Sequence, residues 1–212
     1  MKLYGMNRAP NPRRVTIFLA EKGIPIEIEQ VNVAEGANRT PEYLAVNPRG
    51  LIPALVLDDG TVIDESIAIC RYFEALHPEP NLMGRDAREA AVIECWQRRI
   101  EFDGLATIAA VYRNTQPLFA NRAQPGGGPD TAQIPDLAER GRLLLPGFFA
   151  TLNDRLGESP YIAGDRYTIA DISAIVAIDF ARWIKARIPE EHANTLRWHA
   201  EVTDRPSYAA AS

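Results

Sequence analysis

The sequence predicts a fold in two parts, an α/β unit followed by an all-α unit, and three observations support this division. Up to about residue 76, patterns typical of strands and of helices follow one another. Helix breakers then cluster in residues 77–81, which read HPEPN. Beyond this cluster the strand-like patterns stop, and apolar residues recur at helical spacing only. We therefore expect an N-terminal domain over residues 1–77, a linker over residues 78–86 and a C-terminal helical bundle over residues 87–212.

The N-terminal unit is expected to contain its elements in the order β-α-β-α-β-β-α. Apolar and polar residues alternate with a period of two in residues 26–31, which is typical of a strand. Gly23 ends the first helix, because glycine accepts the left-handed backbone found there, and Pro41 opens the second, where an N–H is not needed. The expected strands cover residues 2–4, 26–31, 54–57 and 61–63, and the expected helices cover residues 15–22, 41–44 and 67–76.

The stretch from Pro53 to Ser66 carries the first functional signal. Pro53 precedes an apolar run and therefore starts a strand, where its missing N–H costs least. The Asp58-Asp59-Gly60 turn reverses the chain into the next strand. Glu65 and Ser66 stand where the following helix opens. Free N–H groups and the positive end of the helix dipole, with a serine hydroxyl beside them, predict a site for a small anion.

The C-terminal unit is predicted to consist of long helices. Helical spacing extends from residue 86 to about residue 113, and again from residue 134 to 156. Between these helices, residues 124–129 read QPGGGP and predict a flexible loop. Thr168 and Asp171 form a capping-box pattern at the start of a further helix, which stabilises a helix end by about 1 kcal/mol. That role is structural, so neither residue is a site candidate.

Composition excludes several function classes. With 46% hydrophobic and 24% charged residues, the chain has the composition of a globular protein. Its net charge of -5, without a long basic run, gives no indication of nucleic acid or an anionic membrane surface as partner. No apolar run approaches the ~18 residues of a membrane span and no signal sequence opens the chain, so we expect a cytoplasmic protein. Cys70 and Cys95 lie in helical patterns and lack C-x-x-C spacing, so they are interpreted as buried free thiols, and no metal site is expected.

Several motifs around Pro53 resemble a known family. The Ile52-Pro53 pair follows a turn, a D-D-G hairpin comes next, and the helix opens with E-S-x-A-I. These features are similar to the N-terminal domain of the cytosolic glutathione transferases, which has a thioredoxin-like fold, and the resemblance extends from about residue 1 to residue 208. It implies that Ile52, beside a cis Pro53, offers backbone groups to the cysteinyl part of glutathione. Glu65 and Ser66 would hold the γ-glutamyl carboxylate and amine.

The resemblance does not fully identify the residues that bind the glycyl carboxylate and the amine at the two ends of glutathione. The glycyl carboxylate is expected near Asn38 and Arg39, and an arginine suits a carboxylate. Leu51 stands where the family frequently has lysine, so that contact stays open. Either Glu101 or Asp103 could face the glutathione amine, as acidic residues do across the dimer interface in relatives. The resemblance thus implies glutathione as co-substrate, no metal, a homodimer and a role in detoxification.

The chain departs from most of the family where the catalytic side chain normally stands. The loop after the first strand, residues 6–15, contains no serine, cysteine or tyrosine. Ala9 or Pro10 takes the usual position, and Ala9 is expected beside glutathione. In this respect the chain is similar to the bacterial and fungal class typified by the second yeast glutathione transferase. In that class the thiol is thought to be activated by the N-terminus of the first helix and by an ordered water held by the C-terminal domain.

Candidates for lowering the thiol pKa follow from this departure. A helix N-terminus favours a thiolate as it favours any anion. Asn11 can donate an amide hydrogen bond, and Arg13 or Arg14 adds positive charge. By analogy alone, Tyr112 and Asn114 are candidates for the polar side chains of the C-terminal domain that hold the ordered water. The alternative interpretations are a turn role for Asn11 and a solvated helical turn for the two arginines.

The second substrate is expected to bind among aromatic side chains. Tyr112, Phe119 and Trp183 are candidate walls of an electrophile pocket, with core packing as the alternative for each. We therefore predict a glutathione transferase that conjugates the thiolate to small hydrophobic electrophiles. A glutathione-dependent thiol or disulfide reductase is one alternative, although the N-terminal loop lacks an attacking cysteine. A non-catalytic protein that binds glutathione or an apolar ligand is another, which the loss of the usual hydroxyl at Ala9 favours.

Overall fold

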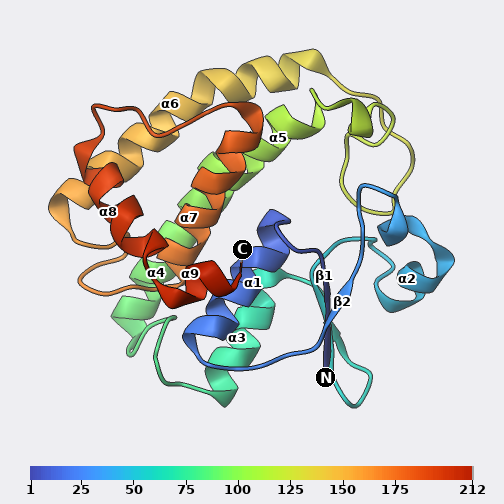
Figure 1. The fold of residues 1–212 in the computed structure, drawn as a ribbon, viewed down its shortest axis with the longest axis horizontal. Coiled ribbons are helices and arrows are strands. Elements are labelled where there is room, and N and C mark those ends of the chain that lie inside the picture. Colours follow the sequence, from blue (N-terminus) through green and yellow to red (C-terminus); the bar gives the residue numbers. More distant parts are fainter. Residues whose placement is uncertain (212) are drawn as a thin grey trace.

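The computed structural model describes residues 1–211, and its N-terminal part is a four-stranded mixed sheet with helices (Figure 1). The strands run in the order β2-β1-β3-β4, with β1 parallel to β2 and antiparallel to β3. The predicted order of elements is confirmed. These elements are β1 (Lys2–Gly5), α1 (Pro10–Glu21), β2 (Ile28–Gln30), η1 (Ala37–Arg39), α2 (Pro41–Val46), β3 (Ala54–Val56), β4 (Val62–Ile63) and α3 (Ser66–Leu76).

Helix α1 begins five residues before the predicted start, at Pro10 instead of residue 15. Apolar spacing cannot reveal this turn, because its sequence PNPRR is polar and contains two prolines. Both prolines lie in the first turn, where a helix needs no N–H from them, and Ala9 is the N-cap residue. The earlier start matters for function, since it moves the end of the helix towards the loop in which the catalytic side chain was expected.

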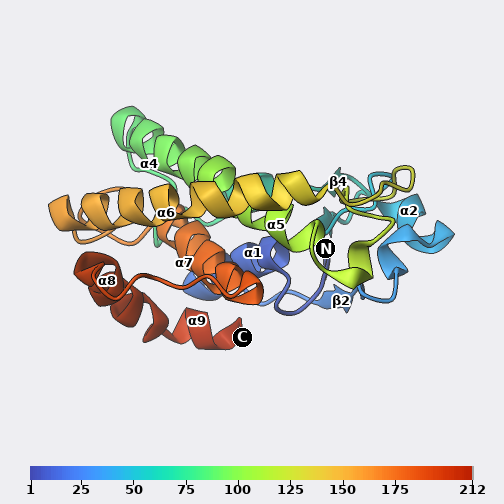
Figure 2. The ribbon, with the colours of Figure 1, turned by 90° about the horizontal axis from the view of Figure 1, so that it is seen from above.

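The C-terminal part is helical, as predicted, and extends over the N-terminal part (Figures 1 and 2). Helices α1 and α7 pack together, which joins the two parts through one continuous apolar core. Helix α7 is buried along almost its whole length. The remaining elements are α4 (Ala87–Arg99), η2 (Ile100–Ala106), α5 (Thr107–Arg113), η3 (Pro117–Phe119), α6 (Pro135–Glu158), α7 (Ile169–Ala181), η4 (Arg182–Ile184), α8 (Ala193–Thr203) and α9 (Pro206–Ala210).

The predicted capping box at the start of α7 is present. The Thr168 N–H donates to Asp171 Oδ2 at 2.9 Å, and the Thr168 hydroxyl accepts from the Ala170 N–H at 3.3 Å. The buried Asp171 carboxylate also accepts from Trp198 Nε1 at 2.9 Å and from the Ile162 N–H at 3.0 Å. Burial raises the pKa of Asp171 to about 6, against the effect of these donors. One local motif therefore fixes α7 and ties α8 to it.

The glycine-rich segment 124–129 is bonded to the N-terminal part. The Gly127 N–H donates to the Arg49 carbonyl at 2.8 Å. A Cβ on Gly50 would lie 2.5 Å from Gly127 N, and a Cβ on Gly127 would lie 2.8 Å from Leu44 Cδ2. The glycines thus permit an approach of two backbones that side chains would prevent. The segment that was predicted as a flexible loop is held against the turn that precedes Ile52.

None of the helices in the described part of the chain is long and apolar enough to cross a membrane.

Candidate active site

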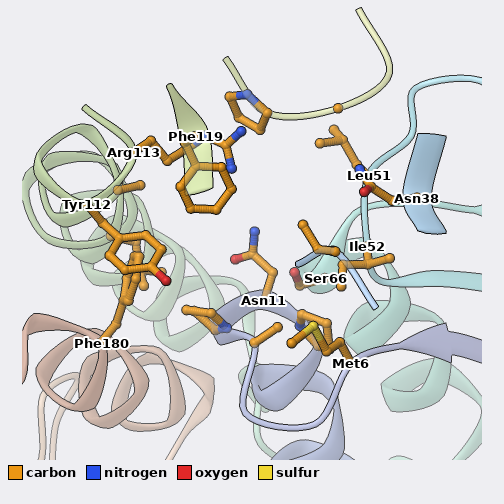
Figure 3. A pocket seen from close by; sticks show the side chains of 18 of the residues that line it. Met6, Asn11, Asn38, Leu51, Ile52, Ser66, Tyr112, Arg113, Phe119 and Phe180 are labelled. Carbon is orange, nitrogen blue, oxygen red and sulfur yellow. The ribbon is translucent and has the colours of Figure 1, made fainter. Parts of the chain in front are cut away.

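A cleft of about 470 Å³ lies between the two parts of the chain and receives side chains from both (Figure 3). The N-terminal part contributes the turn before β3, the start of α1 and the start of α3, and the C-terminal part contributes η2, α5, η3 and the end of α7. Most predicted site residues meet in this cleft. Those that line it are Ala9, Asn11, Arg14, Arg39, Leu51, Ile52, Glu65, Ser66, Tyr112, Phe119 and Trp183.

The Ile52 wall of the cleft is built by hydrogen bonds behind it. The Ile52–Pro53 peptide is cis, and Pro53 does not line the cleft. The Leu51 carbonyl accepts from the Tyr43 hydroxyl at 2.5 Å and from Asn47 Nδ2 at 2.9 Å. Burial raises the pKa of Tyr43 to about 12, so the hydroxyl remains a donor at neutral pH. These bonds hold the turn, in which Leu51 and Ile52 line the cleft.

The start of α3 borders the same wall. Ser66 is the first residue of the helix, is only 4% exposed and lines the cleft (Figure 3). Glu65, the N-cap residue, accepts from Arg49 Nη1 at 2.7 Å. The backbone N–H groups of a first helical turn have no partner within the helix and attract negative charge. The helix start for which an anion site was predicted therefore borders the cleft.

The start of α1 forms the floor of the cleft. Ala9 presents a methyl group where a hydroxyl or thiol was sought. Asn11 lies in the middle, between Ser66 on one side and Tyr112 on the other (Figure 3). Arg14 Nη1 donates to Asn11 Oδ1 at 3.3 Å. Because this bond occupies the amide oxygen, the Asn11 amide nitrogen faces the open cleft (Figure 3).

Arg14 is a buried cation, not a residue of a solvated helical turn. It is 3% exposed and pairs with Glu101 Oε1 at 2.5 Å, and its Nε donates to Ser173 Oγ at 3.0 Å. The two predicted acids lie in different places. Glu101 lines the cleft, whereas Asp103 is exposed outside it. A segment with π-helical bonding, η2, contains both residues and determines which of them faces inward.

An aromatic cluster closes the far side of the cleft. The Tyr112 ring lies 5.5 Å from Phe119, 5.4 Å from Phe180 and 5.3 Å from Trp183, each measured between centroids and each edge to face. Figure 3 shows the Tyr112 hydroxyl directed into the cleft. Burial raises the pKa of this hydroxyl, which therefore stays protonated at neutral pH. Phe180 was missed from sequence, since α7 is apolar all round and offers no distinctive signal.

Polar groups gather at the end of the cleft near Leu51. Asn38 is buried and donates from Nδ2 to the Gly50 carbonyl at 2.8 Å. Arg39 Nη2 donates to the Gly128 carbonyl at 3.0 Å and pairs with Asp130 at 2.9 Å. Arg113 and Arg122 also line this end. Sequence reasoning missed both, because only the folded α5–α6 connection brings them to the N-terminal part.

Asn114 does not line the cleft. Its Nδ2 donates to the Ala110 carbonyl at 2.8 Å, and its Oδ1 accepts from the Ile134 N–H at 2.8 Å. Both ends of the amide are therefore used to connect the end of α5 with the start of α6. Asn114 therefore has a structural role. Of the two candidates from the C-terminal part, Tyr112 and Asn114, only Tyr112 reaches the cleft.

Comparison with known proteins agrees with this arrangement. Family models for the N-terminal and the C-terminal domain of glutathione S-transferases match residues 9–76 and 135–201. The chain is 34% identical to glutathione S-transferase 2 of Saccharomyces cerevisiae, over 98% of this chain and 87% of that protein. It is 34% identical to glutathione S-transferase 3 of Zea mays, over 98% of this chain and 91% of that protein.

Solved structures give the same result. The crystal structure of Gtt2 from Saccharomyces cerevisiae superposes with a TM-score of 0.91 at 32% identity, and all of both chains is covered. A glutathione S-transferase domain-containing protein of Marinobacter aquaeolei has a TM-score of 0.90 at 36% identity, with 98% of this chain and 100% of that one covered. Over nearly its whole length, therefore, this chain belongs to the glutathione S-transferase family and is an enzyme of that family.

Proposed function

We propose that this enzyme conjugates glutathione to small hydrophobic electrophiles and that Asn11 and the N-terminus of α1 stabilise the thiolate. In the reaction the thiol proton leaves to solvent, the sulfur forms a bond to an electrophilic carbon, and the bond between that carbon and its leaving group breaks, with the electron pair going to the leaving group. The observation that carries the proposal is the Asn11 amide, whose nitrogen is turned into the cleft because Arg14 holds its oxygen. A fixed donor directed at sulfur lowers a thiol pKa, as a hydroxyl does in other members of the family.

The charge distribution around Asn11 supports this role. Pro10 and Pro12 have no N–H, so Asn11 supplies the one backbone N–H among the first three residues of α1. The positive end of the helix dipole adds to that donor. Arg14 contributes a buried positive charge, which Glu101 partly neutralises. Donor, dipole and cation together offset the missing hydroxyl at Ala9.

The aromatic cluster supports an apolar second substrate. Tyr112, Phe119, Phe180 and Trp183 present ring edges and faces to one side of the cleft. Such a wall binds apolar surface without specific polar recognition. The protonated Tyr112 hydroxyl is a donor on the electrophile side of the sulfur. Cys70 is buried as predicted, whereas Cys95 is exposed, so the prediction of a buried thiol was wrong for Cys95. A reductase that attacks through its own thiol is not supported, because neither cysteine lines the cleft.

Exposed apolar side chains support the homodimer that the resemblance implies. Phe102 of η2 is 66% exposed, and Leu143 of α6 is 75% exposed. Helices α4 and α6 and strand β4 lie on one side of the molecule (Figure 2). Covering such side chains removes apolar area from water. Light scattering of the purified chain distinguishes one copy of 23.5 kDa from two.

A titration of bound glutathione tests the mechanism. Ultraviolet absorbance of the thiolate is followed against pH for the wild type and for Asn11→Ala. In the wild type we expect a bound-thiol pKa well below the ~8.5 of a free thiol. In Asn11→Ala we expect the pKa to rise by about one unit and kcat at neutral pH to fall by about tenfold, because one unit corresponds to ~1.4 kcal/mol.

Asn7→Ala is the matched control, since Asn7 is exposed and bonds to Gln30 at the edge of β2. It should leave the thiol pKa unchanged. Tight glutathione binding with an unshifted thiol pKa in the wild type would instead identify a binding protein without efficient turnover. An unchanged pKa in Asn11→Ala would assign thiolate stabilisation to the helix terminus alone.

A further inference from the structure

Two arginines of the cleft, Arg113 and Arg122, have no anionic partner among residues 1–211. The guanidinium carbon of Arg113 lies 4.3 Å from the centroid of the Phe119 ring, and that of Arg122 lies 5.5 Å from it. Both residues line the cleft. Neither forms an ion pair with any carboxylate within residues 1–211, whereas Arg14 pairs with Glu101 and Arg39 with Asp130. The Phe119 ring thus holds two positive charges at one end of the cleft.

Neutral carbonyl groups hold both guanidinium groups in position. Arg113 Nε donates to the Ala123 carbonyl at 2.6 Å, and its Nη2 donates to the carbonyls of Arg122 and Gln124 at 2.6 and 3.0 Å. Arg113 Nη1 has no hydrogen-bond partner in the described part of the chain. Carbonyl oxygens satisfy donors but do not cancel charge, so the site keeps a positive charge and an unused pair of N–H groups.

Arg122 fastens this arrangement to the N-terminal part. Its Nη1 donates to the Val33 carbonyl at 3.1 Å, and its Nη2 donates to the Ala34 carbonyl at 3.0 Å. Burial and the neighbouring Arg122 charge lower the pKa of Arg113 to about 10, so Arg113 is still protonated at neutral pH. A half-buried cation next to a second cation costs free energy, and a bound anion would offset that cost.

The position of the pair indicates which anion this is. Along one wall of the cleft, Ser66, Ile52 and Leu51 follow one another (Figure 3). If Ser66 binds the γ-glutamyl end and Ile52 the cysteinyl part, the glycyl end lies beside Leu51. Figure 3 shows Arg113 facing that end from the opposite wall, next to Phe119. Leu51 itself carries no charge that could bind a carboxylate.

We infer that Arg113, supported by Arg122, binds the glycyl carboxylate of glutathione from the C-terminal domain, across the cleft from Leu51. The inference rests on the proposed function, because it takes the orientation of glutathione from Ser66 and Ile52. Its consequence is that the α5–α6 connection completes the glutathione site. The cation that the N-terminal domain lacks at Leu51 is supplied by another part of the chain.

Calorimetric titration with two ligands tests the assignment. The ligands are glutathione and its glycyl monoethyl ester, in which the glycyl carboxylate is uncharged. We expect the wild type to bind glutathione about 10- to 100-fold more tightly than the ester, the range of a charge-assisted hydrogen bond. In Arg113→Gln this preference should fall to within about threefold of unity, while Arg113→Lys should keep an intermediate preference. Arg187→Gln, which removes an exposed arginine outside the cleft, is the matched control and should keep the wild-type preference.

Several outcomes would overturn the assignment. If the wild type does not bind glutathione more tightly than the ester, the assignment is wrong, and this result does not depend on whether Arg113→Gln folds. The assignment is also wrong if Arg113→Gln keeps the wild-type preference for glutathione over the ester. It is wrong as well if Arg113→Gln weakens only the binding of electrophiles that carry a carboxylate, because the bound anion would then belong to the second substrate. The thiol pKa of bound glutathione in Arg113→Gln separates this inference from the proposed function: it should stay lowered, since Asn11 is intact.

Discussion

At the scale of single residues, neighbours in sequence have separate tasks. Arg13 and Arg14 were equivalent candidates, but they lie on different sides of α1. Arg14 reaches the cleft and orients Asn11. Arg13 pairs with Asp179 at 2.5 Å and donates from Nε to the Ala211 carbonyl at 3.2 Å, which ties α1 to the C-terminal end of the chain. One arginine therefore holds a side chain of the cleft, and the other joins the two parts of the chain.

Ser66 gives the sharpest prediction at this scale. Replacing Ser66 by Ala removes the hydroxyl at the start of α3 and leaves the backbone N–H groups in place. We expect the affinity for glutathione to fall by about tenfold, because one charge-assisted hydrogen bond to the γ-glutamyl carboxylate is lost. Calorimetric titration measures the affinity. Ser159→Ala is the control, since Ser159 bonds to Gly164 away from the cleft. Unchanged affinity in Ser66→Ala would move the γ-glutamyl site away from α3.

At the scale of elements, an irregular segment interrupts the long helix that the sequence predicted. The expected helix from residue 86 to about 113 is present as α4 and α5, with η2 between them. An inserted π-type turn rotates the residues that follow, so apolar spacing alone cannot predict which residues face inward. Within this segment Glu101 faces Arg14 and Gly104 faces α6. The irregular turn therefore serves both the cleft and the packing of the bundle.

Gly104 tests the packing at this turn. A Cβ at Gly104 would lie 2.5 Å from Phe148 Cζ, and Phe148 is buried. We expect Gly104→Ala to lower the free energy of unfolding by about 1–3 kcal/mol, because the ring has little room to move. Gly147→Ala on α6 is the matched control, since nothing lies within 4 Å of its added Cβ. It should raise the free energy of unfolding by up to about 1 kcal/mol, the gain in helix propensity. Chemical denaturation measures both, and equal effects of the two variants would contradict the packing argument.

At the scale of the whole molecule, the C-terminal end of the chain returns to the first helix. Arg205 donates from Nε and Nη2 to the two carboxylate oxygens of Glu21, each at 2.7 Å. The Ser207 hydroxyl also donates to Glu21. Helix α9 consequently packs on α1 (Figures 1 and 2). The helix whose N-terminus forms the floor of the site is thus supported by the last helix of the chain.

Glu21→Gln should reveal this link in the pH dependence of stability. Burial raises the pKa of Glu21, but the hydrogen bonds from Arg205 and Ser207 and the Arg205 charge outweigh it, so the pKa lies below its ordinary value of 4.5. The stabilisation is therefore complete above pH 4.5 and is lost as the pH falls through the lowered pKa. At pH 7 we expect Glu21→Gln to lower the free energy of unfolding by about 1–3 kcal/mol.

Urea unfolding of both proteins at several pH values measures this effect. The difference between wild type and variant should shrink on acidification, because protonated glutamate resembles glutamine. Glu158→Gln is the control, since Glu158 is largely exposed and lies 3.5 Å from Arg155. A difference that stays constant down to pH 3 would show that the contribution of Glu21 does not come from its charge.

Local chemistry along the chain was enough to predict the order of strands and helices and the capping box at Thr168. Each depends on residues close in sequence, through apolar spacing, helix capping and turn preferences. The resemblance around Ile52 and Ser66 supplied the expectation of a glutathione site, and these residues do line one cleft.

Only the tertiary structure decided which helix faces form the rest of the cleft. It places Glu101 in the cleft and Asp103 on the exposed surface, adds Phe180, Arg113 and Arg122, and moves Asn114 to a structural position. The physical reason is that a side chain's direction depends on the rotation and packing of its helix, and that long-range backbone contacts position the α5–α6 connection. The spacing of residues along a single segment determines neither the rotation of a helix nor the long-range contacts of a loop.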